Sequence, residues 1–171
     1  MWFILLSKAN PKIPNNANPK PCQRIFSPSC GIGSIFVELQ KQYPTHNLDF
    51  AGTVNNPFFY LLCLANLQAN SIEANIIYDN PIYEPTLEDF YWEDALLDVA
   101  LAVLPFRMKV GEEELDKEFF SDSRKMTNAE FAFIELMFRN LNENGKAIVV
   151  VRENFLFSQQ GKSFRGKYIQ N

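Results

Sequence analysis

A glycine-bearing turn between an apolar strand and a helix constrains the fold more than any other feature of the chain. Residues 25–30 (IFSPSC) are typical of a short strand that runs into a turn, and Gly31 and Gly33 follow it. In residues 33–43 apolar side chains recur at the spacing of a helix. A strand, a tight turn and a helix in this order predict the first half of a βαβ unit.

The same alternation continues to the end of the chain. Four further strands are expected at residues 48–54, 74–80, 96–104 and 146–153, and further helices at 57–70, 128–141 and 161–170. Alternating strands and helices predict an α/β fold with a mostly parallel sheet and helices on both faces. We expect one domain over residues 21–171, preceded by an irregular lead-in over residues 1–20.

Composition excludes several classes of protein. The chain has 171 residues, of which 47% are hydrophobic and 21% charged, so it can bury a core. With a net charge of −4, the chain by itself has no overall electrostatic attraction to the phosphates of nucleic acid. Three cysteines without CxxC spacing and a single histidine argue against a metal site and favour reduced thiols in a cytoplasmic protein. No apolar run is long enough to predict a membrane span.

The glycine turn lies where such sheets bind ligands, outside the carboxyl ends of the strands. Glycines allow the backbone N–H groups to approach a ligand, and the following helix N-terminus favours negative charge. The turn reads CGIG and not GxGxxG, which argues against a dinucleotide. The second strand ends near Thr53 and Asn55, where these folds hold a ribose, and the third ends at Asp79, where a base would lie.

Five segments of the chain occur in the same order as similar segments of a known protein family. They are SPSCGIGS at 27–34, VLPF at 103–106, NAEFAFIELM at 128–137, LNENGKAIVVVRENFLF at 141–157 and GKSFRGKYI at 161–169. These segments resemble the DPACGTGG-like loop, the NPPF loop and the three late segments of adenine-specific DNA methyltransferases. The resemblance is in particular to the modification subunits of type I restriction systems. The resemblance covers residues 20–171.

The resemblance implies a Rossmann-like S-adenosylmethionine-dependent methyltransferase fold and a set of site residues. The cofactor would be bound by residues of the loop and of the next two strand ends, namely Ser27, Pro28, Cys30, Gly31, Gly33, Thr53, Asn55 and Asp79. The catalytic loop would contain Pro105 and Phe106, with Val103 and Leu104 in place of the first two residues of NPPF.

Several positions depart from the family pattern. In the family the Asn of NPPF accepts hydrogen bonds from the amine of a flipped adenine, whereas Val103 has no acceptor. Losing such a contact costs about 10²–10³ in rate. Ser27 and Thr53 stand where the family has acidic residues. The family's YTP-like helix before the loop is not recognisable, and the chain ends before the final antiparallel hairpin, which predicts that the fifth strand is an edge or pairs with a partner.

We therefore expect a DNA adenine N6-methyltransferase domain of a restriction–modification system, with weak or lost activity and weak or lost S-adenosylmethionine binding. DNA would be held through other subunits or domains, among them a specificity subunit. One alternative is a non-catalytic interaction protein that docks a methylase or specificity subunit through an exposed fifth strand and a Phe-rich surface. Another is a working methyltransferase with a protein or small-molecule substrate.

The remaining conspicuous residues receive structural interpretations. Helical spacing predicts that Phe58, Phe59 and Tyr60 pack in the core and do not line a ligand site. The acidic stretch at residues 112–118 is expected to be a solvated loop. A charged face of the last helix is expected to carry Lys162, Arg165 and Lys167.

Overall fold

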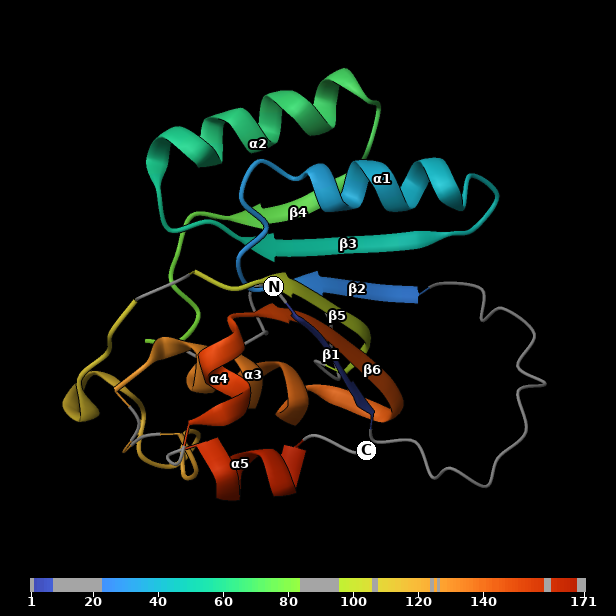
Figure 1. Cartoon of the computed structure of the whole chain (residues 1–171). Coiled ribbons are helices and arrows are strands. Elements are labelled where there is room, and N and C mark those ends of the chain that lie inside the picture. Colours follow the sequence, from blue (N-terminus) through green and yellow to red (C-terminus); the bar gives the residue numbers. More distant parts are fainter. Residues whose placement is uncertain are drawn as a thin grey trace.

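The computed structural model describes residues 2–7, 23–83, 96–105, 108–123, 125, 127–158 and 161–168. One six-stranded sheet runs through this part of the chain in the order β1-β6-β5-β2-β3-β4 (Figure 1). The strands are β1 (Trp2–Ser7), β2 (Gln23–Ser27), β3 (Leu48–Thr53), β4 (Ala74–Ile77), β5 (Leu97–Val103) and β6 (Leu141–Val151). The helices are α1 (Ser34–Gln42), α2 (Pro57–Ala69), α3 (Ala129–Arg139), α4 (Glu153–Phe157) and α5 (Gly161–Tyr168), with a 3₁₀ turn η2 (Glu112–Glu114).

Five of the strands are parallel and place their carboxyl ends at one edge of the sheet. Strand β2 lies in the middle, with Ser27 opposite Gly52 of β3 and Phe26 opposite Ala100 of β5. Thr53 lies opposite Ile77 of β4 on the outer side. The predicted Rossmann-like α/β fold is therefore confirmed, and the segments that follow β2, β3, β4 and β5 lie together at this edge (Figure 1).

The amino-terminal strand corrects two expectations. Residues 2–7 are not part of an irregular lead-in but form β1, which pairs antiparallel with β6 from Trp2 opposite Val151 to Ser7 opposite Lys146. Strand β6, the fifth predicted strand, is therefore not a sheet edge. An extended segment gains ladder hydrogen bonds by pairing with an open sheet edge, which explains why it lies there. The rest of the expected lead-in lies outside the described residues.

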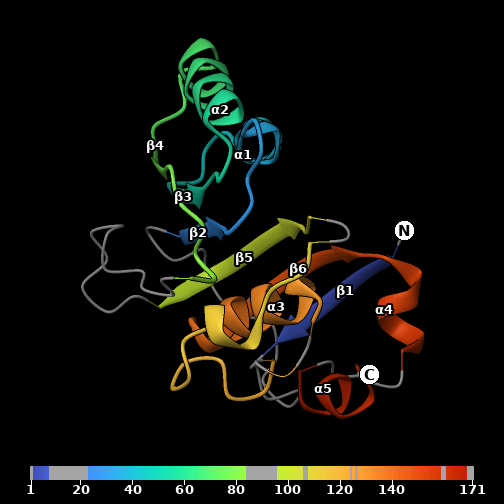
Figure 2. The same cartoon turned by 90° about the vertical axis from the view of Figure 1, so that its left-hand side faces the viewer.

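Helices cover the two faces of the sheet at different places (Figure 2). Helices α1 and α2 lie over β2, β3 and β4, whereas α3, α4 and α5 lie on the opposite face near β5, β6 and β1. Neighbouring side chains of β2 point to opposite faces of the sheet. Ile25 belongs to the apolar cluster with α1 and α2, and Phe26 belongs to the cluster with α3. The sheet thus separates two apolar cores.

Helix α3 is buried along most of its length. Nine successive residues from Ala129 to Met137 are buried, including two glutamates. Glu130 accepts hydrogen bonds from Arg152, and Glu135 accepts from the backbone and side chain of Ser123 and from Arg139. Both buried carboxylates are paired, so the helix can occupy the core with its charges compensated.

Candidate functional site

The glycine turn connects the buried end of β2 to the amino terminus of α1. Gly31 and Gly33 have φ values of +57° and +74°, in the left-handed region that favours glycine. The carbonyl of Gly33 accepts hydrogen bonds from the N–H groups of Phe36 and Val37 and so starts the helix. The predicted strand–turn–helix arrangement is present, and the α1 amino terminus lies at the carboxyl edge of the sheet (Figure 1).

The two glycines serve the turn differently. A Cβ atom on Gly33 would lie 3.0 Å from Cys63 Sγ and 3.2 Å from Leu67 Cγ, so this glycine allows α2 to pack against the turn. A Cβ atom on Gly31 would meet no atom within 4 Å. Gly31 is therefore required by the backbone conformation alone, and its outer side is open for a ligand.

Cys30 connects the glycine turn to β3 and packs with α2. Its N–H and its thiol both point to the carbonyl of Thr53, at 3.2 and 3.4 Å. Cys63 on α2 belongs to the same buried apolar cluster. Interaction with the Cys63 thiol, together with burial, raises the pKa of Cys30 well above that of a free thiol, so this group is a neutral packing and hydrogen-bonding residue. Both cysteines are free and buried.

Thr53 closes the turn from the side of β3. Its side chain is buried and donates a hydrogen bond of 2.7 Å from Oγ1 to the carbonyl of Pro28. The proposed ribose-binding hydroxyl is thus already bonded to the loop, and its oxygen has only acceptor capacity left. Val54, the next residue, is also buried, and Asn55 is the first exposed polar side chain after β3.

Two buried oxygens near this edge lack a hydrogen-bond partner in the described part of the chain. They are Oγ of Ser27, at the end of β2, and Oδ1 of Asn80, just after β4. Asp79 is exposed beside Asn80 and accepts a 2.6 Å hydrogen bond from its N–H. Buried oxygens without partners are costly, which makes them candidates for ligand contact. Asn80 was not predicted, although it follows Asp79 directly at the expected strand end.

The segment after β5 contains the predicted catalytic positions. Val103 ends the strand and is 50% exposed, whereas Leu104 is 1% exposed and belongs to the core. The N–H of Leu104 donates to the carbonyl of Val150. Pro105 is partly buried, and Phe106 lies outside the described residues. The structure therefore brings Val103 to the edge that carries the glycine turn and turns Leu104 away from it.

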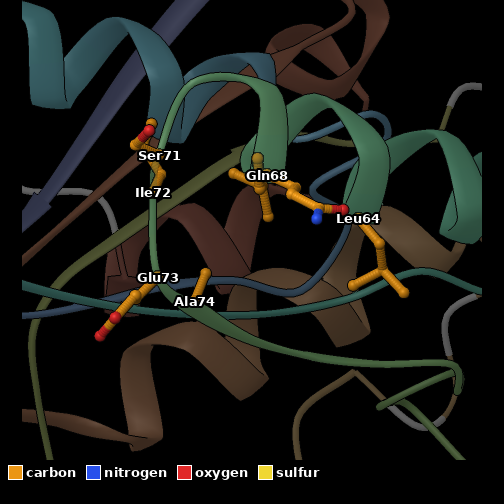
Figure 3. A pocket seen from close by; sticks show the side chains of 7 residues that line it. Leu64, Gln68, Ser71, Ile72, Glu73 and Ala74 are labelled. Atoms are coloured by element: carbon orange, nitrogen blue, oxygen red, sulfur yellow. The ribbon is translucent and has the colours of Figure 1, made fainter.

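A hollow of about 490 Å³ lies elsewhere on the molecule. It is lined by the carboxyl-terminal half of α2 and the segment leading into β4, from Leu64 to Ala74 (Figure 3). Glu73 points away from the hollow in this view. Because β4 begins here, the hollow lies at the amino ends of the strands, and its lining includes no predicted site residue.

The expected core position of the aromatic residues of α2 is wrong for two of them. Phe58 and Phe59 are 64% and 47% exposed, whereas Tyr60 is partly buried. The acidic stretch is solvated as expected, since Glu112, Glu113 and Glu114 are all exposed. Lys162 and Lys167 are exposed on α5, and the side chain of Arg165 lies outside the described set.

No helix in the described part of the chain is long and apolar enough to cross a membrane. The described His, Cys, Asp and Glu side chains form no group of three that could hold a metal ion.

Solved structures share this fold. A type I restriction–modification system methyltransferase subunit from Streptococcus thermophilus superposes with a TM-score of 0.70 and 18% identity, over 89% of this chain and 34% of that one. A protein described as a class I S-adenosylmethionine-dependent methyltransferase from Listeria monocytogenes gives 0.69 and 16%, over 86% and 46%. A precorrin-6y C5,15-methyltransferase from Geobacter metallireducens gives 0.52 and 15%, over 84% and 60%.

The chain spans a third to a half of the length of the first two of these structures. No curated protein matches it by sequence. The model of the N-6 DNA methylase family matches residues 9–170, which is nearly the whole chain and includes every predicted site residue. The chain therefore belongs to the N-6 DNA methylase family.

Proposed function

We propose that this chain is a methylase domain whose methyl transfer to adenine is weak or lost and whose affinity for S-adenosylmethionine is low. The observation that carries the proposal is Val103. At the end of β5, beside the glycine turn, the chain presents a half-exposed isopropyl group. The resemblance assigns this position to an asparagine that accepts a hydrogen bond from the target amine.

The residues around the glycine turn fit the cofactor in part. Gly31 leaves the outer side of the turn open, and Asp79 and Asn80 offer oxygens for the amino group of an adenine. Asn55 is the exposed polar group nearest in sequence to the ribose position. When bound, S-adenosylmethionine would supply an electrophilic methyl group at this edge. Where the family has a carboxylate for the two ribose hydroxyls this chain has Thr53, which is buried and bonded to the loop.

The target side lacks the group that orients a base. A valine cannot accept a hydrogen bond from an exocyclic amine, so it cannot hold the nitrogen lone pair toward a methyl donor. One missing contact of this kind lowers the rate by about 10²–10³. Pro105 and Phe106 keep the family's residue types, and by the resemblance Phe106 would still stack on a flipped base.

Binding to DNA would depend on other subunits or domains. The net charge of −4 gives the chain no overall attraction to phosphates. We place it in the cytoplasm, with a specificity subunit of a restriction–modification system as the partner that would recognise the DNA sequence.

Transfer of a labelled methyl group to adenine-containing DNA tests this proposal. The wild-type chain should remain at background, and Val103→Asn should raise the rate by about 10-fold or more because it restores the acceptor. Val103→Asn is preferred to a double exchange that includes Leu104→Pro, since the N–H of Leu104 is hydrogen-bonded to Val150. Val103→Leu is the matched control, because leucine has the size and branching of asparagine but no hydrogen-bond acceptor. Wild-type turnover that Phe106→Ala abolishes would overturn the proposal.

A second candidate is a non-catalytic interaction protein, and the exposure of Phe58 and Phe59 on α2 favours it. In this function the glycine turn would only support α2 through Cys63 and Leu67. The two candidates differ in one measurement. If the Val103→Asn variant shows no methyl transfer although circular dichroism shows that it is folded, the interaction function is favoured.

A further inference from the structure

Helix α2 is unusual for a helix on the outside of a domain. None of its residues from Pro57 to Ala69 is charged. Asn56 is its N-cap and accepts hydrogen bonds from the N–H groups of Phe58 and Phe59. The helix therefore begins at the carboxyl edge of the sheet. A helix that is apolar all round is normally covered on every side.

Only one side of α2 is covered by the described part of the chain. Cys63 and Leu67 are buried against the glycine turn and α1. Figures 1 and 2 show α2 as the outermost layer, beyond α1 and the sheet. Its remaining large apolar side chains expose between 38% and 65% of their surface: Phe58, Phe59, Leu61, Leu62 and Leu64.

The exposed apolar area is large enough for a protein interface. With a full surface of about 200 Å² for each side chain, these five residues expose roughly 500 Å². An ordinary interface buries about 800 Å² on each partner, of which a little over half is apolar. The α2 surface, defined as these five side chains, could therefore supply the apolar part of one such interface by itself.

The order of side chains along the exposed face indicates how a partner would lie. Phe58, Leu61, Leu62 and Ala65 recur at positions i, i+3, i+4 and i+7, which is a single stripe on a helix. The stripe is bulky at its amino end and small at its carboxyl end. An antiparallel copy of the same helix would place Phe58 opposite Ala65 and Leu61 opposite Leu62, so that large side chains meet small ones at the two ends.

We propose that the α2 surface binds a second copy of this chain, with the two α2 helices antiparallel across a two-fold axis near Leu61 and Leu62. A two-fold interface brings each surface against itself, so any charge on it would face its own copy. The absence of charged residues from α2 removes that repulsion. The same neutrality gives no electrostatic attraction for an acidic or basic partner.

Sedimentation velocity of the full chain tests the proposal, over concentrations up to about 100 µM. The wild-type chain should form a dimer, and Leu61→Glu should weaken it by more than about tenfold, because the glutamate would be buried against an apolar partner. Leu61 is 65% exposed, so this exchange should not disturb folding. Phe157→Glu is the matched control: Phe157 on α4 is 73% exposed and lies away from α2, so the dimer should persist.

Disulfide trapping tests the antiparallel register. When chains carrying Phe58→Cys are mixed with chains carrying Ala65→Cys, mild oxidation should link one to the other, whereas either variant alone should give no more linked dimer than the wild type. A wild-type chain that is monomeric throughout the range, or a dimer unaffected by Leu61→Glu, would overturn the proposal. Equal linking in the separate and mixed samples would overturn the register.

Discussion

Exchange of Gly33 for alanine should destabilise the fold through two separable effects. The φ value of +74° places an L-residue in the left-handed region, which costs about 1–2 kcal/mol. The new Cβ would also lie 3.0 Å from Cys63 Sγ and 3.2–3.3 Å from two carbons of Leu67. Overpacking of this kind adds about 1–3 kcal/mol. The expected loss in the free energy of unfolding is therefore about 2–5 kcal/mol.

Gly31→Ala is the matched control. It has a left-handed φ of +57° but no atom within 4 Å of the new Cβ, so only the backbone cost of about 1–2 kcal/mol applies. Urea unfolding followed by circular dichroism gives both values, and a difference of about 2 kcal/mol would move the midpoints roughly 1 M apart. Adding Cys63→Ala should recover part of the loss in Gly33→Ala and none in Gly31→Ala. Equal destabilisation by the two alanines would refute the packing contribution.

Three further exchanges test individual interactions in the fold. Thr53→Val removes the hydrogen bond to the glycine loop and should lower the free energy of unfolding by about 1 kcal/mol, whereas Thr53→Ser should retain most of it in the same urea assay. Glu135→Ala leaves the buried N–H and hydroxyl of Ser123 without their acceptor and should cost about 3 kcal/mol. Burial raises the pKa of Asp122, but hydrogen bonds from Lys167 and Tyr168 outweigh this and hold it below its usual value. The resulting stabilisation is present above about pH 4 and is lost as the pH falls through the lowered pKa. Thermal melts from pH 7 to pH 2 should therefore show a smaller acid loss for Asp122→Asn than for the wild type.

The sequence predicted the parts of the fold that depend on neighbouring residues. The strand, turn and helix around Gly31 and Gly33 follow from local apolar spacing and from the conformations that glycine allows. The carboxyl-edge positions of Thr53, Asp79 and Val103 follow from parallel strand order alone.

The errors concern long-range contacts. Strand β1 pairs with β6 across more than 130 positions, and nothing in residues 1–7 specifies that partner. Periodicity showed that Phe58 lies on a helix, but it could not distinguish a face turned to the core from a face turned outward. The bond from Thr53 to the loop carbonyl and the unpartnered oxygen of Asn80 depend on side-chain geometry, for which the sequence carries no signal.

The proposed low affinity follows if the glycine turn has kept its shape while the polar groups around it have been replaced. Each charge-assisted hydrogen bond to a ribose hydroxyl contributes about 1.5–3 kcal/mol, and losing such bonds weakens binding by about 10- to 100-fold or more. Isothermal titration of the chain with S-adenosylmethionine measures this directly. We expect a dissociation constant weaker than about 0.1 mM, and binding in the low micromolar range would refute the proposed loss of affinity.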